Sequence, residues 1–139
     1  MMFRYRIWGD GLKSVVWKLH WCGYGFHCGI WYDQKLVGVI GLHYLDLVNK
    51  RTSIGYYLAE DFQKKGIMTR CTKALIQYVY EEYDINRIEI RMSTKNKKSR
   101  AIPIRLGFTQ EGILRSDERL QGEFSDSYVY SLLREEYDD

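Results

Sequence analysis

The chain has 139 residues, 45% of them hydrophobic, and a formal net charge of +3, as expected for one globular domain spanning residues 1–139. So small a charge, without a basic stripe, argues against nucleic-acid binding. No apolar run could cross a membrane and residues 1–25 lack a signal-peptide pattern, so we expect a cytoplasmic protein without membrane contact.

The three cysteines are odd in number and lack CxxC spacing, which predicts reduced thiols. His20, Cys22, His27 and Cys28 lie close in sequence and raise zinc as an alternative. His27 and Cys28 fall in a predicted strand, where neighbouring side chains face opposite sides, and distant residues would have to complete four ligands. We therefore predict no metal site.

Residues 1–25 predict one short strand and one helix. Alternating apolar and polar residues at 3–8 are typical of an edge strand. The apolar residues of 12–19 recur at the spacing of one helix face, so we expect a helix there. The tryptophans of this segment need a surface to cover, and we therefore expect self-association through residues 1–25.

Three antiparallel strands follow. Residues 26–32 and 36–45 predict a hairpin, because the residues between them, 33–35, have turn composition. A second turn at 49–51 leads into a strand over 53–59.

A polar loop at 60–66 ends in glycine and precedes a helix predicted over 67–82 by its apolar periodicity. A strand, a tight loop and a helix gather backbone N–H groups at the helix N-terminus, which suits an anion. Lys64, Lys65 and Arg70 add positive charge, so a diphosphate is the natural ligand. The alternative is an ordinary turn with solvated lysines.

Residues 86–93 predict the next strand, and the helix between it and 53–59 implies a crossover with parallel pairing. A second helix is expected over 94–106, ended by Gly107. Pro103 lies inside this helix and should kink it, because proline removes a backbone hydrogen bond.

The predicted sheet closes with a hairpin of residues 108–115 and 124–133, connected by 118–123. These elements predict an α/β (α+β) fold, a mixed and mostly antiparallel sheet flanked by helices.

Residues 63–68, Gln-Lys-Lys-Gly-Ile-Met, resemble the Gln/Arg-x-x-Gly-x-Gly/Ala loop of the GNAT acetyltransferases, which holds the pyrophosphate of acetyl-CoA. Met68 stands where that pattern has Gly or Ala, and Lys64 where glycine is more usual. The run 54–69 is more similar to the RimL-like ribosomal-protein N-acetyltransferases. Further resemblances are Asn96-x-x-Ser99, Leu106-Gly107-Phe108 and Gln110-Glu111-Gly112, so the likeness covers about residues 26–134 and implies the GNAT fold.

The resemblance also implies roles for individual residues. Glu60 would take the proton from the amine as general base, with Asp61 as the competing carboxylate, and Ser99 would protonate the departing thiolate. A backbone N–H near Leu58 or Ala59 would stabilise the oxyanion. The residues implied to hold acetyl-CoA are Leu58, Ala59, Gln63, Lys64, Lys65, Gly66, Ile67, Met68, Asn96 and Ser99.

The resulting hypothesis is an N-acetyltransferase that moves the acetyl group of acetyl-CoA directly to a primary amine, a protein N-terminus of the ribosomal-protein type. A polyamine or an aminoglycoside is the alternative acceptor. Relatives carry a first strand and two helices before the hairpin, so residues 1–25 form a shortened front end that affects the acceptor side. A non-catalytic CoA-binding module or a truncated remnant therefore remains a second hypothesis.

Overall fold

The structure is a computed structural model that describes residues 4–9, 12–22, 25–32, 34–64 and 66–137. For the first two strands only the backbone path is described. No helix in the described part of the chain is long and apolar enough to cross a membrane. Within the same residues, no group of three or more His, Cys, Asp or Glu side chains is arranged to hold a metal ion.

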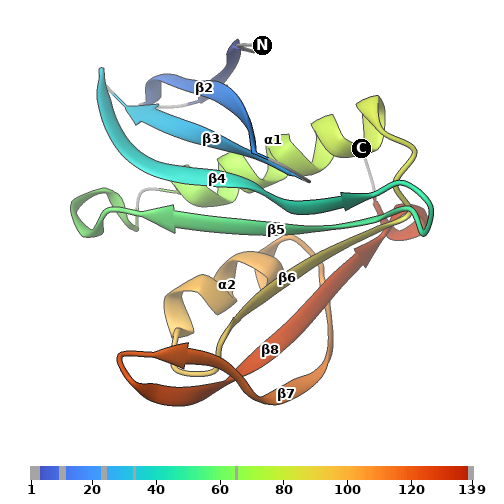
Figure 1. Cartoon of the computed structure of the whole chain (residues 1–139). Coiled ribbons are helices and arrows are strands. Elements are labelled where there is room, and N and C mark those ends of the chain that lie inside the picture. Colours follow the sequence, from blue (N-terminus) through green and yellow to red (C-terminus); the bar gives the residue numbers. More distant parts are fainter. Residues whose placement is uncertain (1–3, 10–11, 23–24, 33, 65, 138–139) are drawn as a thin grey trace.

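One eight-stranded sheet forms the centre of the molecule (Figure 1), with the order β1-β2-β3-β4-β5-β6-β8-β7. Its strands are β1 (Arg4–Gly9), β2 (Leu12–Cys22), β3 (Gly25–Tyr32), β4 (Lys35–Asp46), β5 (Arg51–Leu58), β6 (Arg87–Ser93), β7 (Thr109–Leu120) and β8 (Glu123–Leu133). β5 and β6 pair in parallel and all other described neighbours are antiparallel. The predicted mixed, mostly antiparallel sheet and its parallel crossover are therefore confirmed.

Two helices, α1 (Ile67–Glu82) and α2 (Lys97–Arg105), cover one face of this sheet. The buried stripe of α1 joins Ile102 of α2 and the inward residues of the strands in one hydrophobic cluster. α2 reaches the same face through Arg100, whose guanidinium lies 4.4 Å from the ring centre of Tyr128 and donates to the hydroxyl of Tyr130. The predicted bounds of the first helix, 67–82, are thus confirmed.

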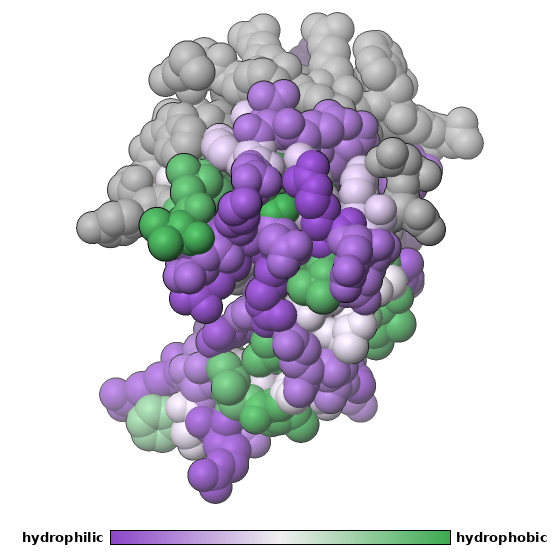
Figure 2. Space-filling view, turned by 90° about the vertical axis from the view of Figure 1, so that its right-hand side faces the viewer, coloured by the Kyte–Doolittle hydropathy of each residue, from purple (hydrophilic) through white to green (hydrophobic). Residues whose placement is uncertain are grey.

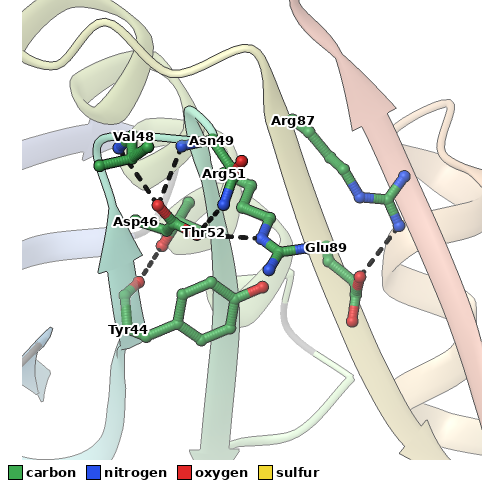
Figure 3. A network of polar contacts seen from close by, with 8 residues as sticks. All are labelled: Tyr44, Asp46, Val48, Asn49, Arg51, Thr52, Arg87 and Glu89. Atoms are coloured by element: carbon green, nitrogen blue, oxygen red, sulfur yellow. Dashed lines mark hydrogen bonds and ion pairs between the residues drawn. The ribbon is translucent and has the colours of Figure 1, made fainter.

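The opposite face carries polar side chains. On β6, Ile88 and Ile90 are buried in the core, whereas Glu89 between them faces away and pairs with Arg87 (Figure 3). Successive residues of a strand alternate between the two faces, so Arg91 shares the side of Glu89. At the β4–β5 turn Asp46 accepts from the backbone N–H groups of Val48 and Asn49, which closes this end of the sheet.

The side of the molecule that contains the β4–β5 turn is mostly hydrophilic (Figure 2). Its described hydrophobic residues form small patches separated by polar side chains. Single exposed apolar residues such as Val48 are ordinary surface features. The glycine loop lies at the other end of β5.

The helix predicted for residues 12–19 is wrong, because this segment is the strand β2. It pairs with β1 on one side and with β3 on the other. Val15, Val16 and Trp17 are β-branched or aromatic and favour strands. The spacing of the apolar residues alone did not distinguish a helix from a strand.

The predicted connection at 118–123 is also too long. β7 continues to Leu120, and the hairpin turns through Gln121 (φ 51°) and Gly122 (φ 83°). Two central residues with positive φ match the twist of antiparallel strands. The register of β7 shifts between Leu114 and Glu118, which hides the alternation that would reveal the longer strand.

Candidate active site

β5 and β6 separate before either strand ends. Their ladder runs only from Arg51 paired with Arg87 to Ile54 paired with Ile90. β5 continues to Leu58 and β6 to Ser93, and Figure 1 shows the two strands diverging toward the end where the loop before α1 lies. Beyond Ile54 and Ile90 the facing edges of the two strands are therefore not hydrogen-bonded to each other.

Two neighbouring cavities lie at this separation. The larger, of about 520 Å³, adjoins the start of α1 and is lined by eight of the predicted binding residues, Leu58, Gln63, Lys64, Gly66, Ile67, Met68, Asn96 and Ser99. The smaller, of about 460 Å³, is lined from β5, β6, the start of α2 and β7. Both cavities share Tyr56, Asn96 and Ser99, so these residues mark their junction.

At Gly66 the loop before α1 leaves the start of the helix open. Gly66 precedes the first residue of α1 with φ 75° and ψ 6°, and a Cβ added to it would meet nothing within 4 Å. The helix N-terminus therefore faces open space rather than packed side chains. Gln63 fixes the loop, because its Nε2 donates to the Leu58 carbonyl at 2.9 Å and its Oε1 accepts from Lys98 Nζ at 3.2 Å.

The geometry separates the two predicted oxyanion donors. The N–H of Ala59 donates to the Val37 carbonyl at 2.8 Å, so it is not free for a substrate. Gly38 lies opposite Leu58 in the same ladder, and hydrogen-bonded and non-hydrogen-bonded pairs alternate in antiparallel strands. The N–H of Leu58 therefore points away from β4, toward the separation from β6, and Leu58 lines the larger cavity.

At the junction, the Asn96 side chain caps α2 by accepting from the N–H of Ser99 at 3.1 Å. The Asn-x-x-Ser pattern is thus a helix N-cap as well as a cavity wall. The hydroxyl of Tyr56 donates to the Ser99 carbonyl at 2.8 Å. That carbonyl has no N–H four residues later because Pro103 lies there, so the proline allows Tyr56 to tie β5 to α2.

Burial raises the pKa of Tyr56 well above its ordinary value. Its hydroxyl therefore stays protonated and continues to donate to α2.

The predicted bases lie elsewhere. Glu60 and Asp61 belong to the short 3₁₀ helix η1 (Glu60–Phe62), are exposed, and line neither cavity. Ala59 likewise lines neither cavity, and Lys65 lies outside the described residues.

Glu118 is the functional candidate that sequence reasoning missed. It lines the smaller cavity together with Ser99, and among the described residues it has no ion-pair partner, whereas the neighbouring Asp117 has one. A carboxylate in the lining of this cavity is suited to accept a proton from an amine. Only the irregular alternation of apolar and polar residues over 109–120 could have indicated that Glu118 belongs to a strand rather than to the connection between two strands.

A family model described as "Acetyltransferase (GNAT) domain" matches residues 4–109. The chain belongs to the GNAT acetyltransferase family. The predicted family and its fold are thereby confirmed.

Three similar proteins illustrate the relationship. A putative ribosomal N-acetyltransferase, YdaF of Bacillus subtilis (strain 168), is 43% identical over 114 residues, 82% of this chain and 62% of that protein. The structure of RimL, a ribosomal L7/L12 alpha-N-protein acetyltransferase in complex with coenzyme A, is 31% identical with a TM-score of 0.77, covering 83% of this chain and 65% of that one. The microcin C7 self-immunity acetyltransferase MccE, in complex with acetyl-CoA and AMP, is 38% identical with a TM-score of 0.75, covering 79% and 61%.

The chain thus spans less than two thirds of the length of these relatives. Membership of the family concerns this domain. It does not by itself identify the activity, substrates or partners of the whole protein.

Lys64 offers a test of the loop conformation, because it has φ 66° where a glycine would be unstrained. We expect Lys64→Gly to stabilise the fold by up to about 1 kcal/mol in denaturant unfolding. Lys64→Gln removes the same charge but keeps the Cβ, so it should leave stability unchanged. Equal stabilisation by both variants would attribute the effect to charge and contradict the loop geometry.

Proposed function

We propose that this protein is an N-acetyltransferase that transfers the acetyl group of acetyl-CoA directly to a primary amine. The observation that carries the proposal is the pair of cavities that meet at Tyr56, Asn96 and Ser99 where β5 and β6 separate. Two substrates can approach such a junction from different sides and meet at it. Family membership and relatives named as acetyltransferases support the same reading.

In this proposal the larger cavity holds acetyl-CoA. The N-terminus of α1 and Gly66 would receive the diphosphate, with Lys64 in the lining of the cavity and Lys65 next to it in the sequence. The N–H of Leu58 would donate to the carbonyl oxygen as it gains negative charge. Ser99 would stand beside the sulfur, protonate the departing thiolate and recover a proton from the nitrogen that has attacked.

The smaller cavity would receive the amine. Only a neutral amine has the lone pair needed for attack, so a base must remove a proton from the ammonium form. We assign this role to Glu118, because it lines the smaller cavity beside Ser99. Glu60, the base implied by resemblance, remains the competing assignment and would need a water or a loop movement to reach the junction.

For the acceptor we propose a protein N-terminal amine, in a cytoplasmic reaction. The support is the similarity to YdaF and to RimL, whose names refer to ribosomal proteins. The smaller cavity is lined by two cations, Arg91 and Lys95, and one carboxylate, Glu118. A polyamine or aminoglycoside carries several positive charges and would be less favoured by that lining.

An acetyl-CoA turnover assay with a panel of N-terminal peptides, polyamines and aminoglycosides tests the proposal. We expect release of free CoA that depends on the peptide, with acetylation of its α-amine seen by mass spectrometry. Binding of acetyl-CoA without acetylation of any acceptor would instead support the non-catalytic CoA-binding module.

Self-association belongs to the same proposal. β1 ends the sheet, and its outer edge has no partner strand in the described part of the chain, which leaves backbone groups able to pair with a second copy. We expect a dimer by light scattering at high micromolar concentration. A strictly monomeric protein under these conditions would contradict this prediction.

A further inference from the structure

We propose that Arg91 and Asp117 are positioning residues that hold a bulge of β7 so that Glu118 faces the smaller cavity. The inference rests on the proposed function, in which Glu118 acts as the base. It concerns residues that none of the sequence motifs include.

The bulge itself is visible in the register of the last two strands. Leu114 lies opposite Ser127 and Glu118 lies opposite Ser125. Three residues of β7, 115–117, therefore face the single residue Asp126 of β8. A regular ladder would place Ser116, not Glu118, opposite Ser125.

The bulge places Glu118 opposite Ser125, at the level of the smaller cavity. The hydroxyl of Ser125 lies 2.5 Å from that of Ser93, and Ser93 lines the smaller cavity with Glu118. Without the two extra residues, a serine would occupy this level of the strand. The bulge thus supplies a carboxylate to the lining of the smaller cavity.

Two contacts hold the bulge in its conformation. Ser116 has φ 48°, a backbone conformation that is unfavourable for residues other than glycine. The backbone N–H of Ser116 donates a hydrogen bond to Asp126 Oδ1 at 2.8 Å. Asp117 Oδ1 lies 4.0 Å from Nη1 of Arg91. The residue before Glu118 therefore forms a long ion pair with β6, a strand that contributes to the cavity wall.

Arg91 is itself held by a buried carboxylate. The side chain of Glu89 is only 8% exposed and forms ion pairs with Arg91 on one side and Arg87 on the other. A buried carboxylate needs such partners, and their contacts in turn fix the guanidinium groups. The chain of contacts from Glu89 through Arg91 to Asp117 ends beside Glu118.

The same network contains a matched control. Arg87 also bridges Glu89 to a carboxylate of β7, Glu111, in a close ion pair. Glu111 and Asp117 thus play equivalent parts in joining β6 to β7, but only Asp117 adjoins Glu118. If both ion pairs only stabilised the fold, loss of the closer Arg87–Glu111 pair would affect activity more than loss of the Arg91–Asp117 pair.

The test compares Asp117→Asn, Glu118→Gln, their double variant and Glu111→Gln in steady-state kinetics. We expect Asp117→Asn to lower kcat about tenfold, within the roughly hundredfold that a 1 Å misplacement can cost. The KM for acetyl-CoA should not change, because Asp117 lines neither cavity. Glu111→Gln should keep kcat within about twofold of the wild type, even if it unfolds at a lower denaturant concentration.

The double variant decides between positioning and an independent effect. If Asp117 acts through Glu118, the double variant has the rate of Glu118→Gln alone. A further tenfold loss in the double variant, or a wild-type kcat for Asp117→Asn, would overturn the inference. An unaffected Glu118→Gln would refute the base and the positioning together.

A wild type without any turnover would refute the proposed function, and the positioning is then decided by amide hydrogen exchange. Faster exchange of residues 115–118 in Asp117→Asn than in Glu111→Gln supports the anchoring. Equal rates in the two variants contradict it.

Discussion

Glu118→Gln should lower kcat/KM by roughly 10²–10⁴-fold, the usual contribution of a positioned general base. The substitution keeps the size and hydrogen-bonding capacity of the side chain but removes its ability to take a proton. The KM for acetyl-CoA should stay near its wild-type value, since Glu118 lines only the smaller cavity. The measurement is steady-state kinetics with a peptide acceptor across a range of pH.

The loss should shrink as the pH rises. A free α-amino group has a pKa of about 7.7–8.0, so at higher pH more of the acceptor is already neutral and needs no base. Ser99→Ala should lower kcat without this recovery, because its proposed proton transfer follows the attack of the amine. The different pH profiles of the two variants therefore separate the two roles.

Glu60→Gln is the control for the base assignment. Glu60 lies in η1 and lines neither cavity, so we expect nearly wild-type turnover. A large loss in Glu60→Gln with full activity in Glu118→Gln would reverse the assignment and make Glu60 the base.

Gly66→Val should abolish the binding of acetyl-CoA while leaving a folded protein. The open space at this position is where the diphosphate would approach the N-terminus of α1, and a branched side chain would fill it. For the wild type, acetyl-CoA at about a hundred times its dissociation constant should stabilise the fold by roughly 2.7 kcal/mol. A thermal-shift assay should show this stabilisation in the wild type and not in Gly66→Val.

Gly122→Val provides a matched control for backbone strain. Gly122 has φ 83°, close to the 75° of Gly66, and a Cβ there also meets nothing within 4 Å. It lies in the β7–β8 turn rather than in the loop before α1. Both variants should lose stability through strain, but only Gly122→Val should keep the shift with acetyl-CoA. Loss of the shift in both would show that strain alone explains it.

The sequence predicted those parts of the fold in which local signals agree with one another. Helix 67–82 has an apolar stripe and a glycine start, and the crossover it forms required parallel pairing of β5 with β6. The larger cavity follows from the same loop, which is why eight predicted residues line it. Here local sequence and tertiary contacts favour the same structure.

The parts that could not be predicted depend on long-range pairing. Residues 12–19 carry a helical spacing of apolar residues, but pairing on both sides places them in the strand β2. Glu118 reaches the smaller cavity only because three residues of β7 face one residue of β8. Such a bulge has no sequence signal as clear as that of a glycine turn, so the carboxylate that lines the smaller cavity was not recognisable in advance.

The location of acetyl-CoA is the central claim, and a crystal structure of the complex with acetyl-CoA tests it most directly. The account predicts that the diphosphate lies at the backbone of residues 63–68 and that the thioester lies between the N–H of Leu58 and the hydroxyl of Ser99. It also predicts that the smaller cavity, with Glu118, stays open to an acceptor. A complex in which the thioester lies away from the junction of the two cavities, or in which acetyl-CoA fills the smaller cavity, would contradict the account.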